Sequence, residues 1–199
     1  RTMKKISLLV GALFVAGCLG PPPDPSTFYH LTAEASRGAS AVPVRVGLGP
    51  ITLPGYLDRP QMVTRMSENQ VGRSEAARWA EPLYDNISGA LAENLTRSIQ
   101  PESVVAFPWH PSVGVDYGVA LDFAHFEADS SGVVRLEVAW KITDDRSGAV
   151  LERRATVLDE DTERDGTEAK VVALSRALAR LSDEIAAGLR HVHNQRGAR

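Results

Sequence analysis

The sequence has a single cysteine, few aromatic residues and no large excess of charge of either sign. One cysteine, Cys18, in 199 residues excludes an intrachain disulfide and a zinc site built from several cysteines. Aromatic residues make up 6% of the chain and the formal net charge is -3, so there is no basic excess typical of nucleic-acid-binding proteins. The length is below the roughly 250 residues of a (β/α)8 barrel. These values fit one globular domain of ordinary size.

Long apolar runs are also absent, with one exception near the start of the chain. An uncharged apolar run covers residues 6–16, directly after Lys4 and Lys5. It is too short for a membrane-spanning helix of roughly 20 residues and has the length of a signal-peptide core. We therefore predict that residues 1–17 are a signal peptide. Two residues precede Met3, which is the more natural start.

Cys18 follows two small residues, Ala16 and Gly17, and this order resembles a bacterial lipobox. The resemblance implies cleavage before Cys18, a diacylglyceryl thioether on its sulfur and acylation of the new amino terminus. An ordinary signal peptide with an incidental cysteine is the alternative. Several acyl chains hold a protein on a membrane far more firmly than one. Leu19 stands where enterobacterial lipoproteins of the inner membrane carry Asp, so we expect the periplasmic face of the outer membrane rather than the inner membrane.

After the signal peptide, the chain divides into a tether, one domain and a tail. Residues 18–26 carry the lipidated cysteine and several prolines, which favour an extended, semi-rigid tether. Residues 27–190 are predicted to form a single α+β domain. The polar, basic residues 191–199 are predicted to be a flexible tail.

Hydrophobic periodicity predicts an antiparallel sheet, built around a meander, with two helices packed on one of its faces. Apolar residues at helical spacing indicate one helix at about residues 81–99 and a second from residue 167 to about residue 190. Alternating apolar residues indicate the three strands of the meander at residues 117–126, 134–142 and 150–158. Shorter strands are predicted at residues 28–31, 42–48 and 104–107, and a hairpin at residues 62–73.

Two positions depart from these patterns. Asn94 lies within the apolar stripe of the first helix and interrupts it. Phe126 falls on the opposite alternation from Phe123, which indicates a β-bulge or a twist in that strand.

No pattern in the sequence predicts catalysis, a cofactor or a metal ion. There is no Gly-x-Ser-x-Gly turn, and the one cysteine is assigned to the lipid, so a nucleophile is missing. His125 and Glu127 share one face of a strand, but no third ligand is near in the sequence, and we interpret them as a solvated pair. The acidic runs at residues 144–145 and 159–161 lack the spacing of an EF-hand. We expect a non-enzymatic protein with no cofactor or metal site.

One connection between predicted strands is unusual. Two large residues, Tyr56 and Leu57, lie among turn-forming residues, and the opposite charges Asp58 and Arg59 precede a proline. After the predicted hairpin the chain reads Arg-Trp-Ala-Glu-Pro-Leu at residues 78–83. Tyr56, Leu57, Asp58 and Arg59 are the candidate partner-binding residues. The alternative is that Tyr56 and Leu57 anchor the loop to the core.

These two segments, the lipobox and a meander followed by a helix together resemble the ABC-type transport auxiliary lipoprotein family. The most specific segment is Leu-Pro-Gly-Tyr-Leu-Asp-Arg-Pro-Gln at residues 53–61, and the resemblance covers most of the chain after Cys18. It implies membership of an envelope lipid transport system. Such a system combines a cytoplasmic ATPase, a permease, a periplasmic MCE-domain protein and a lipoprotein on the outer-membrane side. It transfers no catalytic residues to this sequence.

The resemblance favours a docking subunit that holds the MCE-domain protein at the outer membrane for phospholipid trafficking and membrane integrity. Two other functions stay open: a lipid-binding carrier lipoprotein, and a lipoprotein regulator of a cell-wall enzyme. A homo-oligomer is compatible with a docking role, although nothing in the residues sets the number of copies. No nucleic-acid partner is expected.

Overall fold

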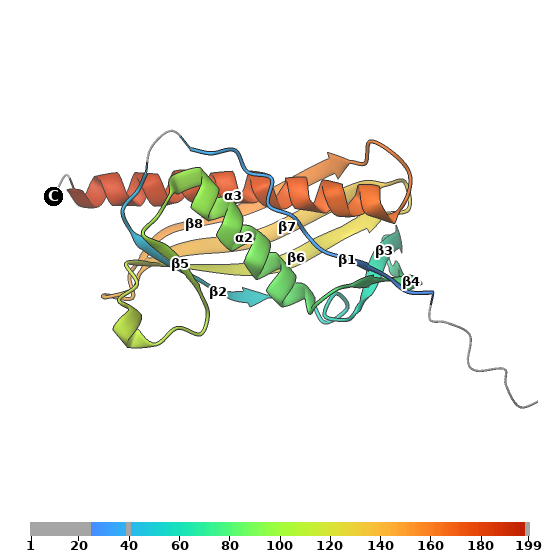
Figure 1. Ribbon diagram of the computed structural model, residues 1–199, viewed down its shortest axis with the longest axis horizontal. Coiled ribbons are helices and arrows are strands. Elements are labelled where there is room, and N and C mark those ends of the chain that lie inside the picture. Colours follow the sequence, from blue (N-terminus) through green and yellow to red (C-terminus); the bar gives the residue numbers. More distant parts are fainter. Residues whose placement is uncertain (1–24, 39–40, 198–199) are drawn as a thin grey trace, which may run out of the picture.

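The computed structural model describes residues 25–38 and 41–197, which form one open sheet with two helices against it (Figure 1). The predicted signal peptide and the lipidation site Cys18 lie outside the described residues, as do residues 18–24 of the tether and residues 198–199. The α+β class is confirmed, and both helices lie on the same face of the sheet.

Within the described residues, the sheet has eight strands. They are β1 (Thr27–Tyr29), β2 (Arg45–Thr52), β3 (Gln61–Ser67), β4 (Gln70–Trp79), β5 (Ser103–Ala106), β6 (Tyr117–Asp129), β7 (Val133–Asp144) and β8 (Val150–Asp161). A short 3-10 helix, η1 (Pro111–Val113), lies between β5 and β6.

The meander predicted from the sequence is present, but the sheet as a whole is mixed rather than antiparallel. β7 pairs antiparallel with both β6 and β8. The other edge of β6 pairs in parallel with β2, where Val46 lies opposite Tyr117, and with β3, where Thr64 lies opposite Ala128. The pairs β1–β4 and β2–β5 are parallel as well. Alternation of apolar residues indicates a strand but not the direction of its neighbour, so the sequence predicted only the antiparallel pairs.

The β-bulge expected near Phe126 is confirmed. The register of β6 against β7 shifts between Phe123 and His125. Because of this shift, Phe123 and Phe126 are both buried, and their rings meet edge to face with centroids 5.7 Å apart. Neighbouring side chains of a strand point to opposite faces, so His125 and Glu127 point away from the helices.

The two predicted helices are α2 (Leu83–Ile99) and α3 (Thr167–Gly197). Pro82 immediately precedes α2, where a missing N–H costs no hydrogen bond, and α2 stops before Pro101, which disfavours helical backbone in the preceding residue. The apolar stripe of each helix is buried, and the two helices pack against each other and on the sheet.

The end of α3 corrects the expectation of a flexible tail from residue 191. Residues 191–197 continue the helix. Val192 is buried and extends the apolar stripe that contains Leu189, while the guanidinium of Arg196 lies 3.3 Å from Asp144. The polar residues of this stretch therefore lie on the solvent-exposed side of the helix. Its other side packs on the end of the sheet.

Residues 31–35 run alongside α2 as an extended segment (Figure 1), held by two buried asparagines. The N–H of Leu31 donates to Asn86 Oδ1 at 2.8 Å, and the N–H of Ala35 donates to Asn94 Oδ1 at 2.9 Å. Both asparagines have no exposed surface. Asn94 thus interrupts the apolar stripe because it supplies an acceptor to backbone that has no strand partner.

Candidate functional site

The two segments that stand out in the sequence meet where β4 ends. The N–H of Trp79 donates to the carbonyl oxygen of Pro60 at 2.8 Å, so the loop before β3 lies beside the turn between β4 and α2. Together they enclose a surface pocket of about 360 Å³, which we call the motif pocket. Its lining residues are Asp58, Arg59, Pro60, Trp79, Ala80, Glu81, Pro82 and Leu83.

Charge and apolar surface are combined in the motif pocket. Trp79 and Leu83 are buried and form apolar wall, whereas Asp58 is exposed and Arg59 is partly buried. The Nε atom of Arg59 is shielded from water and has no hydrogen-bond partner in the described chain. A shielded donor without a partner is uncommon in folded proteins. The rest of the Arg59 guanidinium makes no hydrogen bond or ion pair with the described residues, so its outer N–H groups can bind another molecule.

The four candidate partner-binding residues occupy different environments. Leu57 is 2% exposed and belongs to the hydrophobic core. Tyr56 is partly buried and its hydroxyl is engaged by other side chains of the protein. Asp58 and Arg59 are therefore the two candidates that a partner can reach in this conformation. Tyr56 and Leu57 fix the loop that carries them.

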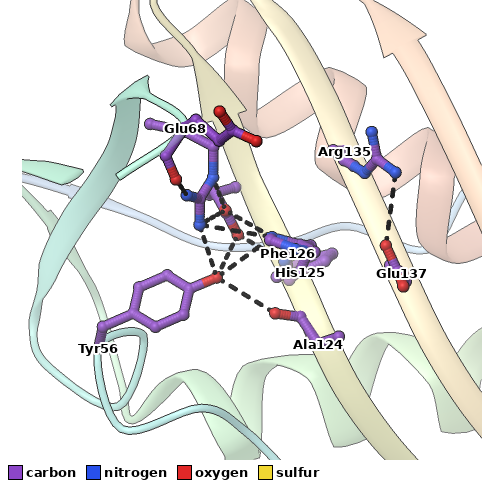
Figure 2. Close-up of polar contacts among 9 residues, drawn as sticks. Tyr56, Glu68, Ala124, His125, Phe126, Arg135 and Glu137 are labelled. Atoms are coloured by element: carbon purple, nitrogen blue, oxygen red, sulfur yellow. Dashed lines mark hydrogen bonds and ion pairs between the residues drawn. The ribbon is translucent and has the colours of Figure 1, made fainter. Parts of the chain in front are cut away.

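Tyr56 joins a cluster of polar side chains on the face of the sheet away from the helices (Figure 2). Its hydroxyl donates to Glu127 Oε2 at 3.0 Å. The guanidinium of Arg65 donates to Glu127 Oε1, with Nε at 2.8 Å and Nη2 at 2.7 Å, and His125 Nδ1 lies 3.0 Å from the same oxygen. We call Tyr56, Arg65, His125 and Glu127 the Glu127 cluster. It joins the loop before β3, β3 itself and β6.

The interpretation of His125 and Glu127 as a solvated pair is wrong. Glu127 is 3% exposed, and the backbone N–H of Phe126 adds a further hydrogen bond to its Oε2 at 2.8 Å. The side chains of Arg65, 62 positions earlier in the chain, and of Tyr56 shield Glu127 from solvent. Sequence reasoning missed Arg65 because its partner is distant along the chain. The available signal was a glutamate between the apolar residues Phe126 and Ala128.

The electrostatics of the Glu127 cluster keep the carboxylate ionised. Burial alone acts to raise the pKa of Glu127, but hydrogen bonds from His125, Arg65 and the backbone outweigh it, and the pKa is lowered. Burial, together with the neighbouring charge of Glu127, raises the pKa of Tyr56 to about 12. Burial also opposes the charge on Arg65, but its hydrogen bonds to Glu127 prevail and its pKa is raised.

This arrangement positions the loop rather than offering a reactive group. Both oxygens of Glu127 already accept several hydrogen bonds, and the Tyr56 hydroxyl stays protonated at neutral pH. Across residues 25–38 and 41–197, no three His, Cys, Asp or Glu side chains are grouped as metal ligands. In the same residues, no helix is both long and apolar enough to span a bilayer.

The family model described as ABC-type transport auxiliary lipoprotein component matches residues 29–186. This range contains both segments of the motif pocket and the whole Glu127 cluster. No curated protein sequence matches the chain.

Two crystal structures have a similar fold. Protein XCC0632 from Xanthomonas campestris superposes with a TM-score of 0.75 at 18% identity, over 87% of this chain and 100% of that one. A second crystal structure, of an uncharacterized protein, gives a TM-score of 0.68 at 21% identity, over 82% of this chain and 98% of that one. At these identities the likeness establishes the fold alone.

Proposed function

Because the chain belongs to the family of ABC-type transport auxiliary lipoprotein components, we propose that it is a non-catalytic docking subunit of an envelope transport system. In this role, acyl chains on Cys18 hold the domain at the periplasmic face of the outer membrane. The domain binds the periplasmic MCE-domain protein of a system that also contains an ABC permease and its ATPase. Docking at this membrane supports phospholipid trafficking and membrane integrity.

The observation that carries the proposal is the convergence of both motif segments on one pocket. Its apolar wall and the guanidinium of Arg59, which has no partner in the described residues, suit an apolar side chain next to a carboxylate on the partner. The buried Leu57 and the Glu127 cluster fix the loop in place before binding. A loop that is already ordered loses less entropy when the partner binds.

At the start of α3, the cavity between the helix and the sheet offers no site for a lipid acyl chain. It is lined by residues such as Met62, Phe126 and Leu174, and its volume is about 40 Å³. A single water occupies roughly 30 Å³ of liquid, and drug-sized ligands need roughly 300 Å³ or more. In this conformation the cavity has no room for an acyl chain.

Charge reversal at the motif pocket tests the docking role. Arg59→Glu places a negative charge where a partner carboxylate is expected, so recovery of the MCE-domain protein in a pull-down from host membranes should fall about tenfold. Arg153→Glu, an exposed arginine on β8, is the matched control and should leave recovery unchanged. Both variants should keep the melting temperature of the native chain. Equal recovery with Arg59→Glu and Arg153→Glu contradicts the proposed site.

The anchor is tested separately at Cys18. Radiolabelled palmitate should mark the native chain, and Cys18→Ser should remove both the label and the protein from the outer-membrane fraction. A variant that stays in that fraction without label overturns the lipid anchor.

A further inference from the structure

The first strand of the domain exposes an aromatic side chain. Phe28, in β1, is 61% exposed, the highest exposure among the large hydrophobic residues of the described chain. An aromatic ring in water costs free energy in proportion to its apolar area, so burying Phe28 against another surface would be favourable. One exposed apolar residue is common on protein surfaces, and the residue beside Phe28 therefore carries the rest of the argument.

An arginine without a partner lies directly beside this ring. In the parallel pairing of β1 with β4, Phe28 is opposite Arg78. Ala77 and Trp79 are buried toward the helices, so Arg78 points to the other face, where Phe28 accompanies it. The Nε atom of Arg78 is shielded from water and has no hydrogen-bond partner in the described residues. By contrast, Arg73 on the same strand pairs with Glu75 at 3.0 Å.

A further apolar residue lies on this face at the start of β4. Val71 is 43% exposed and is paired in register with Arg65, whose side chain is on the face away from the helices. β1 enters the sheet from the side of the β3–β4 turn, because it runs parallel to β4 with Thr27 opposite Ala77. Phe28 and Arg78 therefore lie where the chain enters the sheet, whereas Val71, seven residues before Arg78 on β4, is roughly 23 Å away along the strand. We call Phe28 and Arg78 the entry surface.

The short connection to Cys18 brings the entry surface close to the membrane. Ser26 follows Cys18 by only eight positions, a length of at most about 28 Å when fully extended. α3 alone has 31 residues and is about 46 Å long, and it ends on the side of the molecule opposite β1 (Figure 1). An acylated Cys18 thus keeps the entry surface within about 28 Å of the membrane and able to reach the lipid headgroups, while the far end of α3 lies on the other side of the molecule.

We propose that the entry surface binds the phospholipid bilayer in which the chain is anchored, with Phe28 in the headgroup region and Arg78 on a lipid phosphate. Aromatic rings favour the membrane–water interface, and a guanidinium matches a phosphate with paired hydrogen bonds. The inference rests on the proposed lipid anchor and adds the orientation of the domain on the membrane. It is independent of the partner that the motif pocket binds.

A fluorescent probe at position 28 tests the contact. Phe28→Cys provides a free thiol in the acylated full chain, since Cys18 is blocked by lipid, and the labelled chain is reconstituted into phosphatidylethanolamine–phosphatidylglycerol vesicles. The probe emission should shift to the blue and be quenched by brominated lipid. Val157→Cys is the matched control, because Val157 is 53% exposed but lies on β8, at the opposite edge of the sheet. Its probe should behave as in water.

The charge component is tested with the same probe. Arg78→Gln should lower the ratio of membrane-contacting to free probe about fivefold on anionic vesicles, and Arg153→Gln should leave it unchanged. A chain that floats with the vesicles while the probe at position 28 stays in water overturns this inference alone. A chain that does not float overturns the anchor and the inference together, and equal signals from positions 28 and 157 also contradict the entry surface.

Discussion

Two irregular segments of the domain are fixed to regular elements by buried polar side chains, and they differ in the charge of those side chains. Residues 31–35 are held on α2 by the neutral amides of Asn86 and Asn94. Residues 53–60 are held on β6 by the Glu127 cluster, where a carboxylate meets a guanidinium and a phenol. Only the second attachment depends on an ionised group.

The two attachments also differ in how completely the polar atoms are used. Each asparagine accepts one backbone hydrogen bond, while the Nδ2 atoms of Asn86 and Asn94 have no partner in the described chain. Both oxygens of Glu127 are saturated. Removing one member of a buried ionic group leaves the others unpaired, which costs more than losing a neutral hydrogen bond. The comparison therefore predicts an order of effects on stability.

The largest effect is expected for Glu127→Ala. Loss of the carboxylate leaves Arg65 and Tyr56 without their acceptor, and we expect the free energy of unfolding to fall by about 3 kcal/mol in urea denaturation. Glu137→Ala is the control, because Glu137 is opposite His125 on β7 and pairs with Arg135 at 3.5 Å near the surface (Figure 2). It should cost less than about 0.5 kcal/mol. Similar costs for the two variants would show that burial of Glu127 contributes little.

Asn94→Ala should have the next largest effect, about 2 kcal/mol, because the N–H of Ala35 is then buried without an acceptor. The hydrogen exchange of the Ala35 amide should become faster, which locates the loss in the segment on α2. Unchanged exchange at Ala35 would contradict the role of Asn94.

Lowering the pH should weaken the attachment through Glu127 but not the attachment through Asn94. The folded-state pKa of Glu127 lies below its usual value, so its contribution to stability is complete above the ordinary glutamate pKa and is lost as the pH falls through the lowered one. The difference in unfolding free energy between the native chain and Glu127→Gln should shrink from about pH 4 downward. The corresponding difference for Asn94→Ala should not change with pH. If the stability differences of both variants changed with pH in the same way, the predicted dependence on an ionised Glu127 would be wrong.

The smallest effect is expected for Tyr56→Phe, about 1 kcal/mol, because the hydroxyl makes one short hydrogen bond to Glu127 at 3.0 Å and only longer contacts to Ala124 and Arg65, at 3.2 and 3.3 Å. Tyr84→Phe is the control, because the Tyr84 hydroxyl makes one long hydrogen bond of 3.4 Å at the surface. The melting temperature of Tyr84→Phe should match that of the native chain. A larger loss at Tyr84 than at Tyr56 would contradict the anchoring role of the loop.

The sequence predicted those parts of the fold that depend on local periodicity. The helical stripes, the meander and the bulge near Phe126 all follow from the spacing of apolar residues. The parallel pairing of β2 and β3 with β6 does not, because it joins segments far apart in the chain. The length of α3 was underestimated since Val192 is a single apolar residue in a polar stretch.

The candidate site was predicted only in part, for a related reason. The unusual composition of residues 53–61 and 78–83 identified both walls of the motif pocket, but not that they meet. Asn94 stood out as a polar residue in an apolar stripe, whereas Glu127 was interpreted as part of a solvated pair. Their roles depend on partners contributed by distant segments, the N–H of Ala35 and the guanidinium of Arg65, which no local pattern specifies.

The pairing of β6 on both edges has a consequence for the time course of folding. β3 can pair with β4, and β2 with β5, before β6 exists, but Val46 and Thr64 meet Tyr117 and Ala128 only once β6 has formed. Contacts between positions so distant in the chain slow the search for the native state. A nascent polypeptide that ends before β6 lacks the strand along whose edge β2 and β3 align one after the other. The complete sheet can therefore form only after β6 has been synthesised.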